Sequence, residues 1–310
     1  MRSARSLFAA CSISQSTGAT GCSKLPYMPL ITVAHSPDSD DAFMHFALAE
    51  GKIPCGDIEF RHVLQDIETL NHAAAQGIYE VTALSIHAYA LLTDRYALLN
   101  HGASMGEAGA QGYGPRLISA RPLSPEEVKS QVVAIPGRLT SAYLALKLWA
   151  PQIEVVEMPF DQILPAVVRG EVAAGLLIHE GQLTYGDAGT HLILDLGVWW
   201  GEETGGLPLP LGGNAIRRNL GEELQGRVSH LLRESIRYAL EHREEALDYA
   251  MSFARGLETD RSRADEFVGM YVNARTLDYG DDGRASVKLF LERGFEAGII
   301  KAQPQVEFVG

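Results

Sequence analysis

The chain contains 310 residues, of which 46% are hydrophobic, 21% charged and 8% aromatic, and its formal net charge is −13. A chain of this length and composition folds into about two globular domains, which excludes a disordered, collagen-like or disulfide-stapled protein. The excess of 39 acidic over 26 basic side chains disfavours nucleic acid as a partner, and no apolar run approaches the roughly 20 residues of a membrane-spanning helix.

The first 30 residues differ in charge from the rest of the chain, because they contain three basic residues and no acidic one. The remainder therefore has 23 basic and 39 acidic side chains, a net charge of −16. The apolar stretch near the N-terminus ends at Cys11, which is too short for a secretory signal, so we expect residues 1–28 to be a disordered leader. Only Cys55 of the three cysteines lies beyond this leader, so no disulfide can form within the body and we expect a cytoplasmic location.

From residue 30 onward, short runs rich in Val and Ile alternate with helical patterns, which is typical of parallel sheets covered by helices. A first unit has expected strands at residues 31–34, 58–63, 81–84 and 96–99, with helices at 41–50 and 67–75. A second unit follows the glycines near residue 112. Its expected strands are 116–119, 132–135, 153–158, 173–178 and 192–194, with a short helix capped by Ser124 and longer helices at 141–149 and 162–169.

A Gly- and Pro-rich stretch at residues 205–213 then breaks the regularity, and the chain beyond it is nearly all helical. The expected helices are 224–242, 244–254, 263–271 and 284–297. Four successive helices cannot form a sheet, so we expect them to pack back onto the first unit. This order predicts an α/β, two-lobed type 2 periplasmic-binding-protein-like fold with a central cleft and C-terminal helices. Lobe 1 would comprise residues 29–114 and 215–310, and lobe 2 residues 115–214.

The loop after the first strand, residues 35–41, reads His-Ser-Pro-Asp-Ser-Asp-Asp. Loops at the carboxyl ends of parallel strands face the ligand crevice, so this loop is well placed for function. Its carboxylates could bind a divalent cation. We favour the alternative that Asp40 or Asp41 caps the helix that follows, and we expect no metal site.

Two further strand ends carry candidate binding and catalytic groups. Thr140 and Ser141 place hydroxyls and free backbone amides at a helix N-terminus, which suits a substrate carboxylate, although Thr140 could be only a cap. His179 ends the strand 173–178 and can act as a general base, because an unperturbed histidine has a pKa of about 6.5; a structural role is the alternative. Ser85 follows the strand 81–84 and could add another hydroxyl, but no nucleophile-elbow motif surrounds it.

Six segments of the chain resemble one known family in content and order. They are His-Ser-Pro-Asp-Ser-Asp-Asp-Ala-Phe at 35–43, Asp-Ile-Glu-Thr-Leu-Asn at 66–71, Thr-Ala-Leu-Ser at 82–85, Pro-Gly-Arg-Leu-Thr-Ser-Ala-Tyr at 136–143, Gly-Leu-Leu-Ile-His-Glu at 175–180 and Gly-Leu-Pro-Leu-Pro-Leu-Gly at 206–212. This is the order found in the 1,4-dihydroxy-6-naphthoate synthases of the futalosine route to menaquinone. The related chorismate dehydratases of the same route fit the last two segments less well.

The resemblance implies a lyase that needs no cofactor and converts cyclic dehypoxanthine futalosine to 1,4-dihydroxy-6-naphthoate. It implies that His179 is the base and that Ser85, Thr140 and Ser141 belong to the polar pocket that binds this small-molecule carboxylate. The first loop departs from the family, which more often has Cys-Pro-Asn-Asp-Thr where this chain has residues 38–42. A paralogous chorismate dehydratase, a solute-binding protein that uses the same cleft, and a non-catalytic ligand sensor are the alternatives. The sequence does not indicate an oligomeric state.

Overall fold

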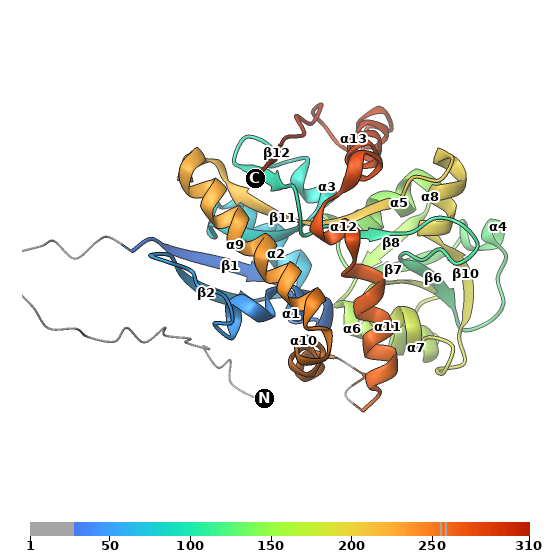
Figure 1. The fold of residues 1–310 in the computed structure, drawn as a ribbon. Coiled ribbons are helices and arrows are strands. Elements are labelled where there is room, and N and C mark those ends of the chain that lie inside the picture. Colours follow the sequence, from blue (N-terminus) through green and yellow to red (C-terminus); the bar gives the residue numbers. More distant parts are fainter. Residues whose placement is uncertain (1–27, 255, 258) are drawn as a thin grey trace, which may run out of the picture.

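The computed structural model describes residues 28–254, 256–257 and 259–310 (Figure 1). The expected leader, apart from Met28, lies outside the described residues. In the part of the chain described, the strands form two sheets. We refer to the part built on the first sheet as lobe 1 and to the part built on the second as lobe 2; the lobe boundaries expected at residues 114 and 214 remain predictions.

The first sheet has seven strands in the order β12-β4-β11-β3-β1-β2, with β5 paired to β11. Its strands are β1 (Leu30–His35), β2 (Glu59–Leu64), β3 (Val81–Ser85), β4 (Tyr96–Leu99), β5 (Ser104–Gly106), β11 (Leu209–Arg217) and β12 (Phe308–Val309). β1 pairs in parallel with β2 and β3, whereas β11 runs antiparallel to β3, β4 and β5. The interior strands β1 and β3 are buried along almost their whole length, because both faces of the sheet are covered.

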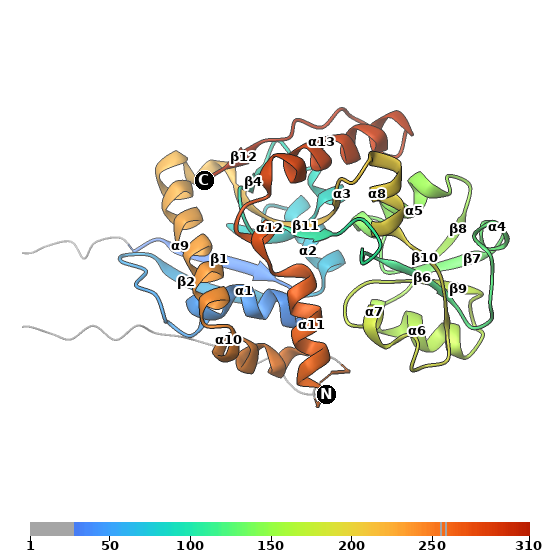
Figure 2. The same ribbon diagram turned by 45° about the vertical axis from the view of Figure 1, so that its right-hand side comes forward.

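The second sheet has five strands in the order β10-β6-β9-β7-β8. They are β6 (Arg116–Ser119), β7 (Val132–Ile135), β8 (Glu154–Glu157), β9 (Ala174–Leu177) and β10 (His191–Asp195). Figure 2 shows these strands together at one end of the molecule, with α6 (Phe160–Val168) and α7 (Gly181–Thr184) below them. β7 pairs in parallel with β8 and β9, which brings the carboxyl ends of these strands to one edge.

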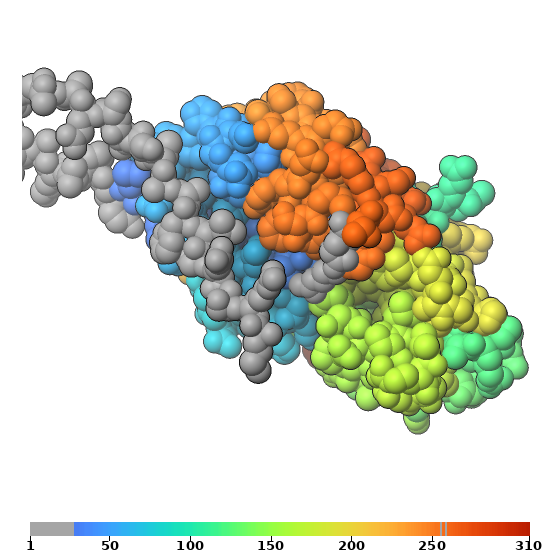
Figure 3. All heavy atoms as spheres, turned by 90° about the horizontal axis from the view of Figure 1, so that it is seen from below, coloured from blue at the N-terminus to red at the C-terminus, as the bar shows by residue number. Residues whose placement is uncertain are grey.

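The C-terminal helices pack mainly on elements of the first sheet and on α1. They are α9 (Glu222–Glu241), α10 (Arg243–Ala250), α11 (Arg261–Tyr271), α12 (Ala274–Leu277) and α13 (Gly280–Glu296). α1 (Ser39–Ala49) contacts α9, α10 and α11 through a core that contains Phe43, Phe46 and Ile236. Figure 3 shows the orange C-terminal segments in contact with the yellow-green segments of lobe 2, so the two lobes touch along this face.

The remaining helices are α2 (Ile67–Ala75), α3 (Ile86–Tyr89), α4 (Pro125–Val128), α5 (Ser141–Trp149) and α8 (Leu196–Thr204). The cap predicted at Ser124 is present, because its side chain accepts from the backbone of Glu127 while the Glu127 carboxylate accepts from the backbone of Ser124. None of the helices in the described residues is long and apolar enough to cross a membrane.

The Gly- and Pro-rich stretch at residues 205–213 differs from its prediction. Its second half begins β11, which lies between β3 and β4 within the first sheet. A register irregularity between Pro210 and Gly212 accommodates the proline, and a Cβ at Gly213 would overlap the hydroxyl of Tyr279. Pairing on both sides therefore outweighs the low strand propensity of these residues.

Candidate active site

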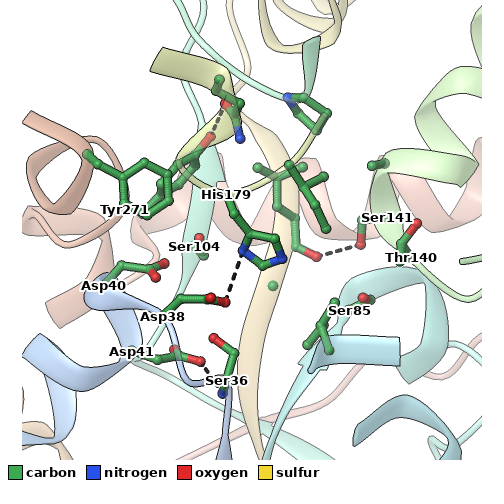
Figure 4. Close-up of a pocket in the computed structure, with 18 residues that line it drawn as sticks. Ser36, Asp38, Asp40, Asp41, Ser85, Ser104, Thr140, Ser141, His179 and Tyr271 are labelled. Carbon is green, nitrogen blue, oxygen red and sulfur yellow. Dashed lines mark hydrogen bonds and ion pairs between the residues drawn. The ribbon is translucent and has the colours of Figure 1, made fainter. Parts of the chain in front are cut away.

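A cavity of about 120 Å³ lies where the two lobes meet (Figure 4). Its polar lining includes Ser36, Asp38, Asp40, Asp41, Ser85, Ser104, Thr140, Ser141, His179 and Tyr271. Lobe 1 supplies the residues that follow β1 and the last residue of β3, whereas lobe 2 supplies the N-terminus of α5 and His179, which lies two residues beyond β9. The structure thus brings together all four site residues predicted from the sequence, Ser85, Thr140, Ser141 and His179, although their roles remain predictions.

His179 lies at the centre of this site and has an unusual backbone. Its φ angle is 63°, a left-handed value that a non-glycine residue adopts rarely and that often marks a functional position. Its Nδ1 lies 3.0 Å from Oδ2 of Asp38, and its side chain is only 14% exposed. The ring of Phe160 lies 4.4 Å from the imidazole, centre to centre. Nε2 is buried and has no hydrogen-bond partner among the described residues.

The carboxyl groups around His179 determine its charge. Burial alone lowers the pKa of the imidazole, but the charges of Asp38, Glu180 and Asp40 raise it to about 9. Burial and the neighbouring carboxylates also raise the pKa of Asp41, to about 6, and hold the pKa of Asp40 well above its ordinary value. At pH 7 His179 is therefore largely protonated in this arrangement.

The acidic loop does not cap α1 in the way we expected. The N-cap residue is Asp38, and in the described structure its side chain makes no cap hydrogen bond; it pairs with His179 instead. Oδ2 of Asp41 accepts a hydrogen bond from the backbone N–H of Ser36 at 2.7 Å, so this carboxylate turns back into the loop. Asp40 lines the cavity. Within the described residues, no group of three or more His, Cys, Asp and Glu side chains is placed to hold a metal ion.

The hydroxyls of Thr140 and Ser141 are both used within the protein. Oγ1 of Thr140 accepts from the backbone N–H of Tyr143 at 3.2 Å and donates to a backbone carbonyl, so Thr140 is the N-cap of α5. Oγ of Ser141 donates to the carbonyl of Leu211 and accepts from the backbone N–H of His87. The backbone N–H groups of Ser141 and Ala142, unlike these hydroxyls, have no partner within the helix, because the first turn of a helix offers them no carbonyl. Both residues line the cavity, so these amides can receive an anion.

Ser85 retains a hydrogen-bond donor. Asn71 Nδ2 donates to its Oγ at 3.1 Å, while the Asn71 carbonyl accepts from the backbone N–H of Ser85. The Ser85 hydroxyl hydrogen is therefore available to a ligand, since Oγ acts only as an acceptor in this contact.

Sequence reasoning missed several residues of the site. Asp38 appeared in the sequence only as one of several acids, and nothing there indicated that it would meet His179. Tyr271 of α11 donates from its hydroxyl to Oε1 of Gln182 at 2.7 Å, and both residues line the cavity. Gln182 lies in a four-residue helix and carried no signal of its own, whereas Tyr271 belongs to a segment, residues 271–274, that shares the family resemblance but was given no place in the site.

Comparison with known proteins identifies similar chains over nearly the whole length. The family described as "Menaquinone biosynthesis" matches residues 31–296. A 1,4-dihydroxy-6-naphthoate synthase from Thermus thermophilus is 40% identical over 282 residues, which cover 91% of this chain and 100% of the relative. The Streptomyces coelicolor protein of the same name is 36% identical over 278 residues, covering 88% of this chain and 95% of the relative.

Solved structures agree on the fold. A crystal structure of an Archaeoglobus fulgidus protein is 48% identical, covers 87% of this chain and 98% of its own, and has a TM-score of 0.82. An alkanesulfonate-binding protein from Xanthomonas axonopodis pv. citri, bound to MOPS, is 10% identical and covers 89% of this chain and 96% of its own, with a TM-score of 0.66. The predicted periplasmic-binding-protein-like fold is therefore confirmed.

Proposed function

This chain belongs to the menaquinone biosynthesis family that includes the 1,4-dihydroxy-6-naphthoate synthases, and from that premise we propose that it is a lyase that converts cyclic dehypoxanthine futalosine to 1,4-dihydroxy-6-naphthoate. The observation that carries the proposal is similarity to a protein of that activity over 91% of this chain and the whole of the relative. The cavity between the lobes adds a chemical argument, because His179 and an anion-binding helix end line the same small space.

The helix end would bind the carboxylate of the substrate. The backbone N–H groups of Ser141 and Ala142 point from the N-terminus of α5, where the helix dipole favours negative charge. The Ser85 hydroxyl can donate a further hydrogen bond. This arrangement explains how a chain with a net charge of −13 can bind an anion, because local amides, and not the overall charge, receive it.

His179 would act as the general base. When Nδ1–H is held by Asp38, the neutral imidazole carries its lone pair at Nε2, which has no hydrogen-bond partner among the described residues. Removal of a substrate proton there would begin the fragmentation of the spiro ring, and formation of the aromatic naphthalene would favour the products. With a pKa of about 9, His179 is neutral in only about 1% of molecules at pH 7. The value of kcat/KM should therefore rise about tenfold per pH unit and level off near pH 9.

A turnover assay tests both parts of the proposal. Purified protein is incubated with cyclic dehypoxanthine futalosine, without added metal or nucleotide, and the naphthoate is measured by chromatography. We expect turnover by the wild type and a loss of about 100-fold or more in His179→Ala. The matched control is His230→Ala on α9, whose side chain is 70% exposed and outside the cavity. Unchanged turnover in His179→Ala refutes its role, whereas binding without turnover in the wild type favours a solute-binding protein.

We also propose that the chain acts in the cytoplasm. The body contains one cysteine, Cys55, so its fold needs no oxidising compartment. Cell fractionation tests this location. Recovery from the periplasm with a cleaved N-terminus would overturn it and would again favour a solute-binding protein.

A further inference from the structure

We propose that Asp38 is a positioning residue for His179, which it holds across the lobe interface in the tautomer whose lone pair is at Nε2. This inference rests on the proposed function, because it assigns Asp38 a role in the same reaction. Asp38 follows β1 in lobe 1, whereas His179 follows β9 in lobe 2. The two side chains meet at 3.0 Å between Oδ2 and Nδ1, and Asp38 is almost completely buried.

The contact selects one tautomer of the imidazole. A carboxylate can only accept, so Nδ1 must carry the hydrogen, and the lone pair of neutral His179 is then at Nε2. The alternative tautomer would place a lone pair against the Asp38 carboxylate and a hydrogen on Nε2, and that nitrogen could then not accept a proton. Phe160 packs against the imidazole from within lobe 2, so the ring is held from both lobes.

The neighbours of the two residues form a second contact across the same interface. Ser39 Oγ donates to Oε1 of Glu180 at 3.2 Å, and both of these residues are buried. Two consecutive residues of lobe 1 therefore contact two consecutive residues of lobe 2: Asp38 pairs with His179, and Ser39 with Glu180. We call these four residues the clasp. His179 is one of these four residues, so the clasp holds both its left-handed backbone and its imidazole ring in place.

The charged groups around the imidazole are Asp38, Asp40 and Asp41 from the loop and helix after β1, and Glu180 from its own segment. Burial lowers the pKa of His179, and Asp38 is the largest of the opposing influences. Removal of the Asp38 charge should therefore move the titration of His179 to lower pH. A purely structural role for Asp38 would not move it in this way.

The test compares Asp38→Asn with Asp38→Glu. Asp38→Asn keeps the shape but removes the charge, so above the pH inflection, where His179 is neutral in both proteins, we expect kcat to fall about 100-fold, with a change in KM of less than about threefold. The inflection of kcat/KM near pH 9 should move to lower pH. Asp38→Glu retains the charge, so it should recover part of kcat and keep the inflection near that of the wild type.

The matched control is Asp187→Asn. Asp187 of lobe 2 pairs with Arg263 of lobe 1 outside the cavity, so this variant removes a lobe-bridging ion pair without touching His179. The control should leave the pH inflection in place. An inflection that stays fixed in Asp38→Asn, or that moves equally in Asp187→Asn, overturns the proposal.

A measurement without substrate separates this inference from the proposed function. Histidine-selective NMR can follow the His179 imidazole as a function of pH, with the signal identified by its loss in His179→Gln. We expect the midpoint to move to lower pH in Asp38→Asn and to stay near the wild-type value in Asp38→Glu. A shifted midpoint in a protein that shows no turnover would support the positioning role and refute the proposed function, whereas an unshifted midpoint would refute the positioning role alone.

Discussion

The buried histidines below the active-site loop should make the protein sensitive to acid. The rings of His35, His45 and His62 lie 4.4 to 5.8 Å apart, centre to centre. His35 is 4% exposed, with Nδ1 3.0 Å from the carbonyl of Ser36 and Nε2 3.2 Å from Nδ1 of His62. Nδ1 of neutral His35 donates to that carbonyl, so Nε2 accepts from His62. A second proton on His35 would set two N–H groups against each other.

The size of the stability loss in acid follows from the pKa of His35. Burial lowers this pKa to about 4, even though the Ser36 carbonyl and Asp38 oppose the change. In the unfolded chain the same imidazole takes up a proton at a pH of about 6.5, so between these values the unfolded state binds more protons. Stability therefore falls as the pH falls. A difference of about 2.5 pKa units corresponds to about 3 kcal/mol from His35 alone. His62 and His45 have lowered pKa values from burial and act in the same direction.

Urea unfolding between pH 7 and pH 4 measures this loss. Wild-type protein should lose about 3 kcal/mol more than His35→Gln between pH 6.5 and pH 4. The informative quantity is the slope against pH, so a lower stability of the variant at pH 7 does not affect the result. His230→Gln, which alters an exposed side chain, is the control and should keep the wild-type slope. Parallel pH dependences of wild type and His35→Gln would refute the reasoning.

Two other substitutions test a buried hydroxyl and a contact between the lobes. Tyr279 is fully buried and its hydroxyl lacks a hydrogen-bond partner among the residues described, so Tyr279→Phe should leave the free energy of unfolding unchanged or raise it by about 1 kcal/mol. A clear loss of stability in thermal unfolding would contradict this. Gly137→Ala would place a Cβ against the Glu68 carboxylate, which accepts from the Leu139 N–H at 3.2 Å and links the lobes. In Gly137→Ala we expect KM to rise about tenfold with little change in melting temperature. Glu68→Gln should raise KM less. Equal KM values in Gly137→Ala and wild type would count against the contact between Glu68 and Leu139 as a link between the lobes.

Local signals were sufficient for most of the fold. α2 was predicted with its observed bounds, because its cap at Asp66 and its apolar spacing agree. β11 was missed, because its pairing with β3, β4 and β5 comes from segments about a hundred residues away and overrides its glycines and proline. α7 and β12 were missed, because they show neither the apolar run that marked the four-residue strands β4, β6 and β7 nor the cap that marked α4.

The same distinction between local and distant signals holds for the site. Ser85 and His179 could be selected because each ends a strand that points to the crevice, a property of one segment of sequence. Asp38 and Tyr271 acquire their contacts from the opposite lobe, so only the assembled chain places them beside their partners. The N-cap role of Thr140 was one of two alternatives, and the contact with Tyr143 supports it.

The position of β11 also constrains the order in which the chain can fold during synthesis. β3 and β4 are made early, yet they are not neighbours in the sheet, since β11 lies between them. A growing chain therefore carries two unpaired strand edges until Arg217 has left the ribosome, whereas the second sheet has all its strands once Asp195 has been made. Lobe 2 can thus fold first, while lobe 1 exposes edges that are prone to aggregation. Chaperone dependence should accordingly reside in the first hundred residues, even though lobe 1 contains the larger of the two sheets in the finished protein.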